Sequence, residues 1–262
     1  MEFSNDPRLA VLIDADNVPY SNVKGMLAEI AKYGTPTFKR IYGDWTKPTV
    51  AGWKSVLLEN AITPIQQYSY TTGKNSSDSA LIIDAMDILY TGRVDGFCIV
   101  SSDSDFTRLA TRLREAGMKV FGIGEKKTPT PFITACDKFI YLEILKPTEV
   151  IGKLTVAKKT KSKSRSQETK DQTPAAPVNT IEIANIGLAK VISDSINDLA
   201  DENGWVFLGD LGNLILKKKP DFDPRNYGFK KLVPLIKSFD QFEIDERDSG
   251  KKNITLVFVR TK

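Results

Sequence analysis

Two patterns of apolar positions divide the chain. Up to about residue 145, short apolar runs rich in β-branched residues alternate with stretches of helical periodicity. Strand–helix alternation of this length is typical of a doubly wound α/β fold, in which helices cover both faces of a parallel sheet. The stretch 78–92 is apolar nearly all round, which predicts a central buried helix. Strands are predicted at 8–14, 36–43, 62–70, 96–102, 118–124 and 139–145.

After residue 180 the pattern changes to three helical stretches followed by two alternating strands. Asp223 is expected to cap the third helix, with Pro224 at its first position, and Pro234 predicts a kink or an earlier end. The hairpin is predicted to turn at residues 248–250. Three helices and a hairpin indicate a small winged-helix domain. The helices are predicted at 183–204, within 205–220 and at 223–239.

A segment poor in apolar residues separates the two patterns. Residues 158–180 contain Val178 as their one aliphatic residue apart from alanines, and they hold six basic and two acidic residues, which accounts for the net charge of +4. We therefore expect a Rossmann-like domain at 1–150, a disordered linker at 151–180 and a winged-helix domain at 181–262. The linker is interpreted as a solvated spacer or as a basic arm that follows a phosphate backbone, and the two interpretations are compatible. It predicts independently tumbling domains.

Composition excludes several kinds of site. The 262 residues include no histidine, which rules out Ser-His-Asp and Cys-His catalysis and histidine-liganded metals. Cys98 and Cys136 are too few for a thiolate zinc site or a disulfide scaffold. Any metal must therefore have oxygen ligands, as magnesium, manganese or calcium do. No signal peptide and no apolar run of about 20 residues is visible, so we expect a cytoplasmic protein with no membrane contact.

Carboxylates gather at one edge of the predicted sheet. The first strand ends in Asp14, the fourth is followed by Asp103 and Asp105, and Asp78 begins the central helix. Ligands of doubly wound sheets bind at the carboxyl ends of the strands. Clustered carboxylates repel one another unless a cation intervenes. With Asn17 beside them, these acids predict a Mg²⁺ or Mn²⁺ site suited to phosphate-ester hydrolysis.

Each of these residues also has a structural interpretation. Asp78 and Asp103 are both placed to cap a helix, although caps have no reason to gather on one sheet edge. Asp84, six positions after Asp78, is a weaker candidate with a structural role, and Asp16 is placed to face outwards. Lys74 either neutralises a substrate phosphate or is a solvated loop lysine.

The segments VLIDADNV and GKNSSDSALIIDAMDILYTGRVDGFCIVSSDSDFTRLATRLREAGMKVFGIG resemble the NYN branch of the PIN-like nucleases, over about residues 8–145. The resemblance implies a metal-dependent ribonuclease with a PIN-like fold, whose acids fall on Asp14, Asp78, Asp103 and Asp105 and whose asparagine falls on Asn17. It implies that these acids hold one or two Mg²⁺ or Mn²⁺ ions, that Asn17 orients phosphate or water, and that cleavage leaves a 3′-hydroxyl and a 5′-phosphate. Ser102 departs from the family pattern, which has glycine there.

The C-terminal region is similar to the OST-HTH (LOTUS) domain over about residues 183–260, through motifs such as Gly204-Trp205-Val206 and Pro220-Asp221-Phe222. That similarity implies an RNA-binding module or a docking site for a protein partner. Its basic residues are candidates for RNA contact, although the domain is neutral overall. The substrate-binding candidates are Lys74, Lys218, Arg225, Lys230 and Lys251.

Two alternatives to a ribonuclease follow from the same residues. The first is a catalytically inactive RNA-binding regulatory adaptor, in which the acids no longer support turnover. The second is a phosphatase of the haloacid dehalogenase type, because Asp14-Ala15-Asp16-Asn17-Val18 resembles the DxDx[TV] signature of that family. In that scheme Asp14 is the nucleophile and Asp16 the general acid, and Asp78 has no role.

Overall fold

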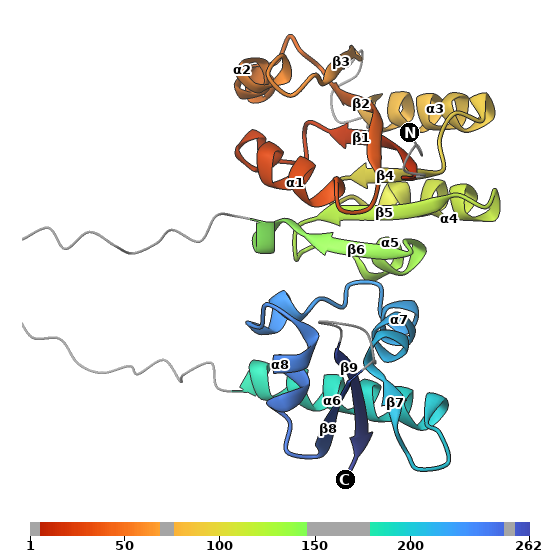
Figure 1. The fold of residues 1–262 in the computed structure, drawn as a ribbon. Coiled ribbons are helices and arrows are strands. Elements are labelled where there is room, and N and C mark those ends of the chain that lie inside the picture. Colours follow the sequence, from red (N-terminus) through yellow and green to blue (C-terminus); the bar gives the residue numbers. More distant parts are fainter. Residues whose placement is uncertain (1–5, 69–75, 146–178, 249–254) are drawn as a thin grey trace, which may run out of the picture.

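The computed structural model describes residues 6–68, 76–145, 179–248 and 255–262, which form two domains (Figure 1). The first contains a six-stranded sheet in the order β3-β2-β1-β4-β5-β6, in which all neighbours are parallel. The order reverses between β1 and β4, which is the topological switch point of a doubly wound sheet. The predicted α/β fold is confirmed. The strands are β1 (Arg8–Asp14), β2 (Thr35–Gly43), β3 (Thr63–Gln66), β4 (Gly96–Val100), β5 (Lys119–Gly124) and β6 (Lys138–Tyr141).

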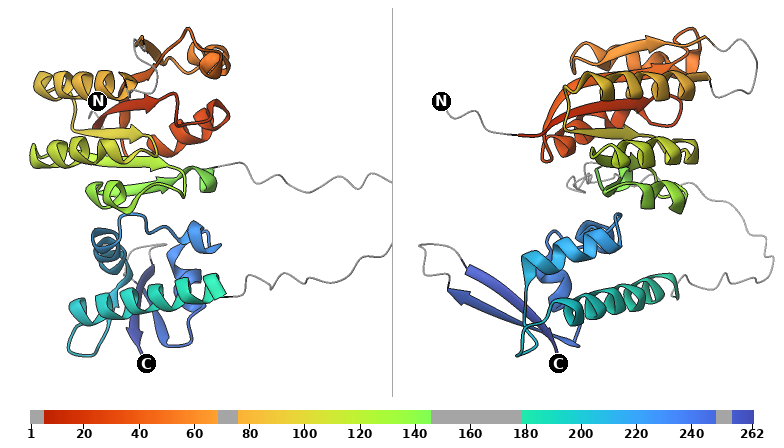
Figure 2. Two further views of the ribbon diagram at one scale, coloured as in Figure 1. Left: turned by 180° about the vertical axis from the view of Figure 1, so that it is seen from behind. Right: turned by 90° about the vertical axis from the view of Figure 1, so that its right-hand side faces the viewer.

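Helices cover both faces of this sheet (Figure 2), and β1 shows why. Its side chains alternate between two apolar cores, Leu9 and Val11 in one and Ala10 and Leu12 in the other. The first core includes residues of α1 (Val23–Ile30) and α2 (Lys54–Leu57). The second includes residues of α3 (Ser76–Thr91), α4 (Thr107–Glu115) and α5 (Thr130–Ala135). Short 3₁₀ helices are η1 (Tyr20–Asn22), η2 (Pro48–Trp53), η3 (Ser104–Phe106) and η4 (Leu142–Leu145).

The central helix α3 is less buried than its sequence predicts. Leu81, Ala85 and Ile88 are buried against the sheet, but Ile83 and Tyr90 are 62% and 74% exposed. The expectation of burial on all sides is therefore wrong, because α3 lies on an outer layer with one face toward solvent (Figure 2). Apolar composition alone does not distinguish the two faces.

The second domain joins helices to a small antiparallel sheet of order β7-β9-β8, as predicted for a winged helix. Its core contains Leu188, Ile192, Leu211, Ile236 and Val259. The elements are α6 (Asn179–Leu199), β7 (Val206–Phe207), α7 (Leu208–Lys218), η5 (Pro224–Tyr227), α8 (Leu232–Lys237), β8 (Phe242–Asp248) and β9 (Thr255–Thr261). The predicted turn of the hairpin falls within 249–254, outside the described residues, apart from Asp248 itself.

The third predicted helix of this domain is divided in two. The Asp223 carboxylate caps it as expected, accepting the Arg225 N–H at 2.9 Å. The helix ends after one 3₁₀ turn because Gly228 adopts a left-handed conformation, with φ of 84°. It resumes only at α8, whose first turn accommodates Pro234.

The two domains contact each other directly, although most of the predicted linker, 151–180, lies outside the described residues. The Phe139 N–H on edge strand β6 donates to the Pro220 carbonyl at 2.9 Å, and the Tyr141 hydroxyl donates to the Asp221 carboxylate at 2.8 Å. The winged-helix domain thus covers part of this edge (Figures 1 and 2). The linker predicted independently tumbling domains, whereas in this structure the domains are joined by direct hydrogen bonds.

An ionic cluster strengthens the domain contact. Arg225 donates two hydrogen bonds to the Glu29 carboxylate, at 2.7 and 2.9 Å, and two side-chain hydrogen bonds to Asp223, at 2.7 and 2.9 Å. Lys32 is also paired with Glu29, whose side chain is 4% exposed. Burial raises the pKa of Glu29, but the hydrogen bonds from Arg225 and Lys32 outweigh it and lower the pKa to about 2. Both partners are ionised at neutral pH.

Candidate metal centre

Four predicted site residues lie at the carboxyl ends of β1 and β4 or beside them. Asp14 is the last residue of β1, and Asp103 and Asp105 follow β4 by three and five residues. Asp78 lies in the first turn of α3, the helix that leads from β3 to β4. The switch point between β1 and β4 therefore brings together residues separated by up to 91 positions.

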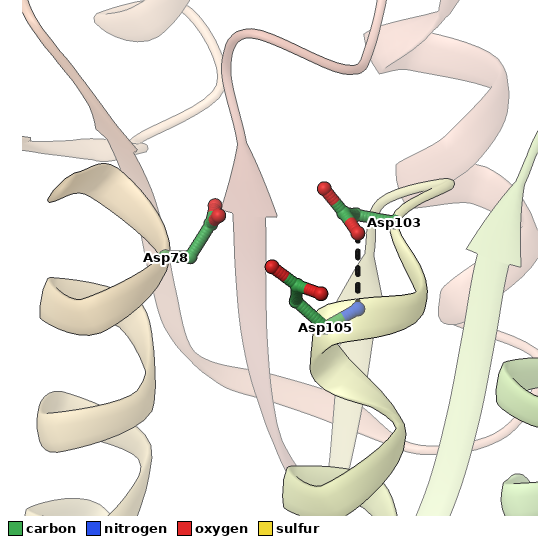
Figure 3. Close-up of side chains that lie close together, drawn as sticks. All are labelled: Asp78, Asp103 and Asp105. Atoms are coloured by element: carbon green, nitrogen blue, oxygen red, sulfur yellow. Dashed lines mark hydrogen bonds between the residues drawn. The ribbon is translucent and has the colours of Figure 1, made fainter. Parts of the chain in front are cut away.

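Three of the four carboxylates form a compact group. Each of Asp78, Asp103 and Asp105 offers an oxygen, and these oxygens all lie within 4.8 Å of one another. Figure 3 shows Asp78 reaching from α3 toward the two acids on the opposite side of the site. Asp78 is buried, Asp103 is half-buried and Asp105 is exposed, so the group opens to solvent on one side. We call these three residues the acidic cluster.

The acidic cluster carries unbalanced negative charge. Burial, together with the charges of Asp14, Asp103, Asp105 and Asp16, raises the pKa of Asp78 to about 7. Among the residues that the structure describes, Asp78 and Asp103 have no salt-bridge partner. A cation bound here would remove the repulsion that raises this pKa.

Asp14 lies behind the cluster and is held in a hydrogen-bond network. Its side chain is buried, and it accepts hydrogen bonds from the Asn17 amide at 2.6 Å, the Ser101 hydroxyl at 2.9 Å and the Asp16 N–H at 3.1 Å. Burial raises the pKa of Asp14, against the effect of these hydrogen bonds. Asp14 is not among the three acids whose oxygens gather within 4.8 Å. In this structure Asn17 contacts Asp14 rather than the acidic cluster.

Serine residues after β4 shape the site, and the sequence analysis did not single out Ser101. The Ser101 hydroxyl joins Asp14 to the next loop, because it also accepts the Asp103 N–H at 3.1 Å. Ser102, which replaces the family glycine, accepts the Glu125 N–H at 2.8 Å and so ties β4 to the end of β5. The position of Ser101, two residues before Asp103, was the sequence signal that could have identified it as a site residue.

Asp103 caps a helix, Asp84 has a structural role and Asp16 faces outwards, as their structural interpretations predict. Asp103 is an N-cap as well as a member of the cluster, since its carboxylate accepts the Asp105 N–H at 2.9 Å (Figure 3). Asp84 is bound by Arg40 and the Tyr42 hydroxyl, which gives it a structural role. Asp16 is exposed and accepts a hydrogen bond from Ser77 at 3.4 Å.

The donor set of the acidic cluster fits a hard divalent cation. It consists of carboxylates alone, the ligands that magnesium and manganese prefer. Asp78 comes from α3, Asp103 is the N-cap of η3 and Asp105 lies within η3, so elements of a packed domain position all three acids. A site of this kind would hold the cation through Asp78, Asp103 and Asp105.

The predicted substrate-binding residues are dispersed. Lys218 pairs with Asp198 at 2.6 Å and lines a cleft of about 310 Å³ between the domains, together with Lys126 and Lys219. Lys230 is exposed, with no salt bridge to a described residue. Arg225 is engaged by Glu29 and Asp223, so its assignment to RNA conflicts with its position in the domain contact. Lys74 and Lys251 lie outside the described residues.

Two domain families match the chain. The model of the NYN domain matches residues 8–143, and the model of the OST-HTH/LOTUS domain matches residues 186–254. These ranges agree with both resemblances seen in the sequence. No curated protein matches the chain. No helix in the described residues is long and apolar enough to cross a membrane.

Solved structures with similarity to the chain include one described as of unknown function and one described as uncharacterised. A protein of unknown function from Vibrio parahaemolyticus is 20% identical with a TM-score of 0.44, and the match covers 54% of this chain and 96% of that one. A Nitrosomonas europaea protein is 29% identical with a TM-score of 0.26, covering 41% and 92%. A Chromobacterium violaceum fragment is 28% identical with a TM-score of 0.24, covering 28% and 78%. Similarity at these TM-scores says nothing further about function.

Proposed function

Because the chain belongs to the NYN family of PIN-like nucleases, we propose that its α/β domain is a metal-dependent ribonuclease that hydrolyses RNA phosphodiester bonds. The observation that carries this proposal is the acidic cluster, three carboxylates within 4.8 Å at the switch point of the sheet. The OST-HTH domain supports RNA as the nucleic acid, as an RNA-binding or docking module.

Mg²⁺ or Mn²⁺ is the cofactor of this proposal, held by Asp78, Asp103 and Asp105. When bound, such an ion stabilises negative charge on a phosphate and makes water a better nucleophile near neutral pH. Asp14 would act through position and charge, since its oxygens are held by Asn17, Ser101 and the Asp16 N–H. In this proposal Asn17, whose amide donates to Asp14 at 2.6 Å, would orient the scissile phosphate or the attacking water.

RNA would reach the site from the exposed side of the cluster. Lys126, Lys218 and Lys219 line the cleft between the domains and would neutralise phosphates of a bound strand, which would compete with Asp198 for Lys218 and with Asp221 for Lys219. Lys230 adds an exposed cation on the second domain. Arg225 supports RNA binding indirectly, by holding the domain that carries these lysines against the nuclease domain.

The phosphatase alternative finds less support in the site. Asp14, its nucleophile, is 1% exposed and accepts three hydrogen bonds. Asp78, which has no part in that reaction, contributes to the acidic cluster. The inactive-adaptor alternative keeps the same RNA contacts without turnover.

Cleavage of a 5′-fluorescent single-stranded RNA tests the proposal. Wild-type protein is assayed with Mn²⁺, with Mg²⁺ and with EDTA, beside Asp14→Asn and the control Asp87→Asn. Asp87 is an exposed acid on the same helix as Asp78 but outside the cluster. We expect metal-dependent cutting by wild type and Asp87→Asn and a loss of cutting in Asp14→Asn. Retained RNA binding with no cutting under any condition would favour the adaptor.

A further inference from the structure

A second cleft adjoins the acidic cluster and plays no part in the proposed metal chemistry. It has a volume of about 290 Å³ and lies between the turn that follows β1, helix η2 and the loop after β5. Asp16 and Asn17 line it, and the Asp16 carboxylate accepts a hydrogen bond at 3.4 Å from Ser77, the residue before Asp78, so the cleft lies beside the acidic cluster. Its volume lies just below the range typical of ligand pockets, which suits a single base.

An exposed aromatic ring forms one wall of this cleft. Tyr20 is 49% exposed, and its hydroxyl makes no hydrogen bond to a residue that the structure describes. The ring packs on Gly52, where a Cβ would come within 2.5 Å of the Tyr20 Cε1. Buried Trp53 lies beside it. Glycine at position 52 thus lets Tyr20 lie close to the backbone, which fixes the ring while leaving half of it open.

The charges of the cleft favour a neutral occupant over a phosphate. Asp16 and Glu125 place two carboxylates in its lining, against one ammonium group, that of Lys127. The Lys127 ammonium is already paired with Glu125 at 2.7 Å. A phosphate in the cleft would meet net negative charge. A nucleobase is neutral, stacks on aromatic rings and carries polar edges that can form hydrogen bonds with polar side chains of the lining.

We propose that this cleft, the Tyr20 cleft, holds one unstacked base of a single-stranded RNA, in a nucleotide next to the phosphate at the acidic cluster. The inference rests on the proposed ribonuclease function and adds a substrate class to it. A base can enter only when it is free of pairing and stacking, so the cleft selects single-stranded over duplex RNA. Tyr20 is the stacking platform, and Gly52 is the positioning residue that holds its ring.

Binding in EDTA tests the cleft without depending on cleavage. A short fluorescent single-stranded RNA is titrated by anisotropy, together with oligonucleotides in which one base at a time is replaced by an abasic site. The proteins are wild type, Tyr20→Ala, Tyr20→Phe and Gly52→Ala. Tyr90→Ala is the control, because Tyr90 is exposed on α3 and outside the cleft.

We expect wild type to bind the intact strand roughly 10-fold more tightly than the strand with one particular base missing. Tyr20→Ala should lower affinity for the intact strand by about the same factor and lose sensitivity to that abasic site. Tyr20→Phe and Tyr90→Ala should behave as wild type. Gly52→Ala should weaken binding although Tyr20 is present, with folding checked by circular dichroism.

Two results would overturn the Tyr20 cleft. The first is that wild type and Tyr20→Ala are equally sensitive to the abasic sites. The second is that Tyr20→Ala loses the same affinity for duplex RNA as for single-stranded RNA, which is expected if Tyr20 belongs to a general or protein-docking surface. If no metal supports cleavage but the expected binding pattern is seen, the ribonuclease proposal is contradicted and the proposal for the Tyr20 cleft is supported. The two failures are therefore distinguishable.

Discussion

Two groups of carboxylates in this protein have opposite electrostatic environments. In the acidic cluster, burial and neighbouring acids raise the pKa of Asp78 to about 7. At the domain contact, Glu29 is just as buried, yet Arg225 and Lys32 lower its pKa to about 2. The difference lies in the counter-charge: Arg225 and Lys32 pair with Glu29, whereas none of the described residues forms a salt bridge with Asp78. Glu29 therefore joins the domains, whereas the acidic cluster has the charge that our proposal assigns to binding a cation.

The largest expected effect comes from removing one acid of the cluster. Asp103→Asn keeps a side-chain oxygen that can cap η3 but removes a ligand charge. We expect kcat for RNA cleavage to fall by roughly 100-fold or more, equivalent to about 3 kcal/mol of transition-state stabilisation. Single-turnover cleavage with saturating Mn²⁺ measures this, with circular dichroism as the folding control. Unchanged cleavage by a folded variant would show that Asp103 has no catalytic part.

The contact between the domains should weaken when Arg225, the counter-charge of Glu29, is removed. Arg225→Ala leaves buried Glu29 without its main partner, and we expect docking to weaken by about 2 kcal/mol, or about 30-fold. The 30% exposure of the Arg225 side chain keeps this below the cost of a fully buried pair. Small-angle X-ray scattering should show a larger radius of gyration. The control Lys230→Ala, which removes an exposed cation, should leave the radius of gyration unchanged. An unchanged radius of gyration in Arg225→Ala would show that Arg225 does not hold the two domains together.

Neutralising a clustered acid should stabilise the metal-free protein. Asp78 has a folded pKa of about 7, above its unfolded value of 3.8, so ionisation costs stability as pH rises between these values. Asp78→Asn avoids this cost, and we expect it to raise stability by about 1–2 kcal/mol at pH 8 with no effect near pH 4. Thermal unfolding in EDTA at both values measures it. A variant less stable than wild type at pH 8 would contradict unbalanced charge in the cluster.

Acid should weaken domain docking through Glu29. The lowered pKa of about 2 means that docking is fully stabilised above the ordinary pKa of 4.5 and loses that contribution as pH falls toward 2. We expect a roughly 10-fold shift toward undocked domains by pH 3.5. Scattering across this range measures it. Glu29→Gln should remove this component, and an equal pH response in that variant would assign it to other groups.

Much of the fold was readable in the sequence because strands and helices have different periods. Both domains and the convergence of Asp14, Asp78, Asp103 and Asp105 on one sheet edge follow from that alternation and from the rule for strand ends. Local signals also identified the cap at Asp223. The end of the helix at Gly228 was not predicted, because a glycine within a helical pattern does not by itself indicate a left-handed conformation.

Contacts between segments that are distant in the sequence could not be predicted from the pattern of apolar and polar residues. Nothing in the period of α1 marks Glu29 as the partner of Arg225, 196 positions away, and Arg225 was assigned to RNA from its charge alone. Likewise, Asp14 was expected to be a metal ligand, whereas the structure directs its oxygens to Asn17 and Ser101. The Tyr20 cleft depends on Gly52, which lies in a different element.

Binding of Mn²⁺ tests most directly whether the acidic cluster serves an external cation. Electron paramagnetic resonance follows the loss of free Mn²⁺ as wild type, Asp78→Asn and the control Asp87→Asn are added. We predict that wild type and Asp87→Asn take up Mn²⁺ equally and that Asp78→Asn binds it at least about 10-fold more weakly. No uptake by wild type, or equal uptake by all three proteins, would contradict the account.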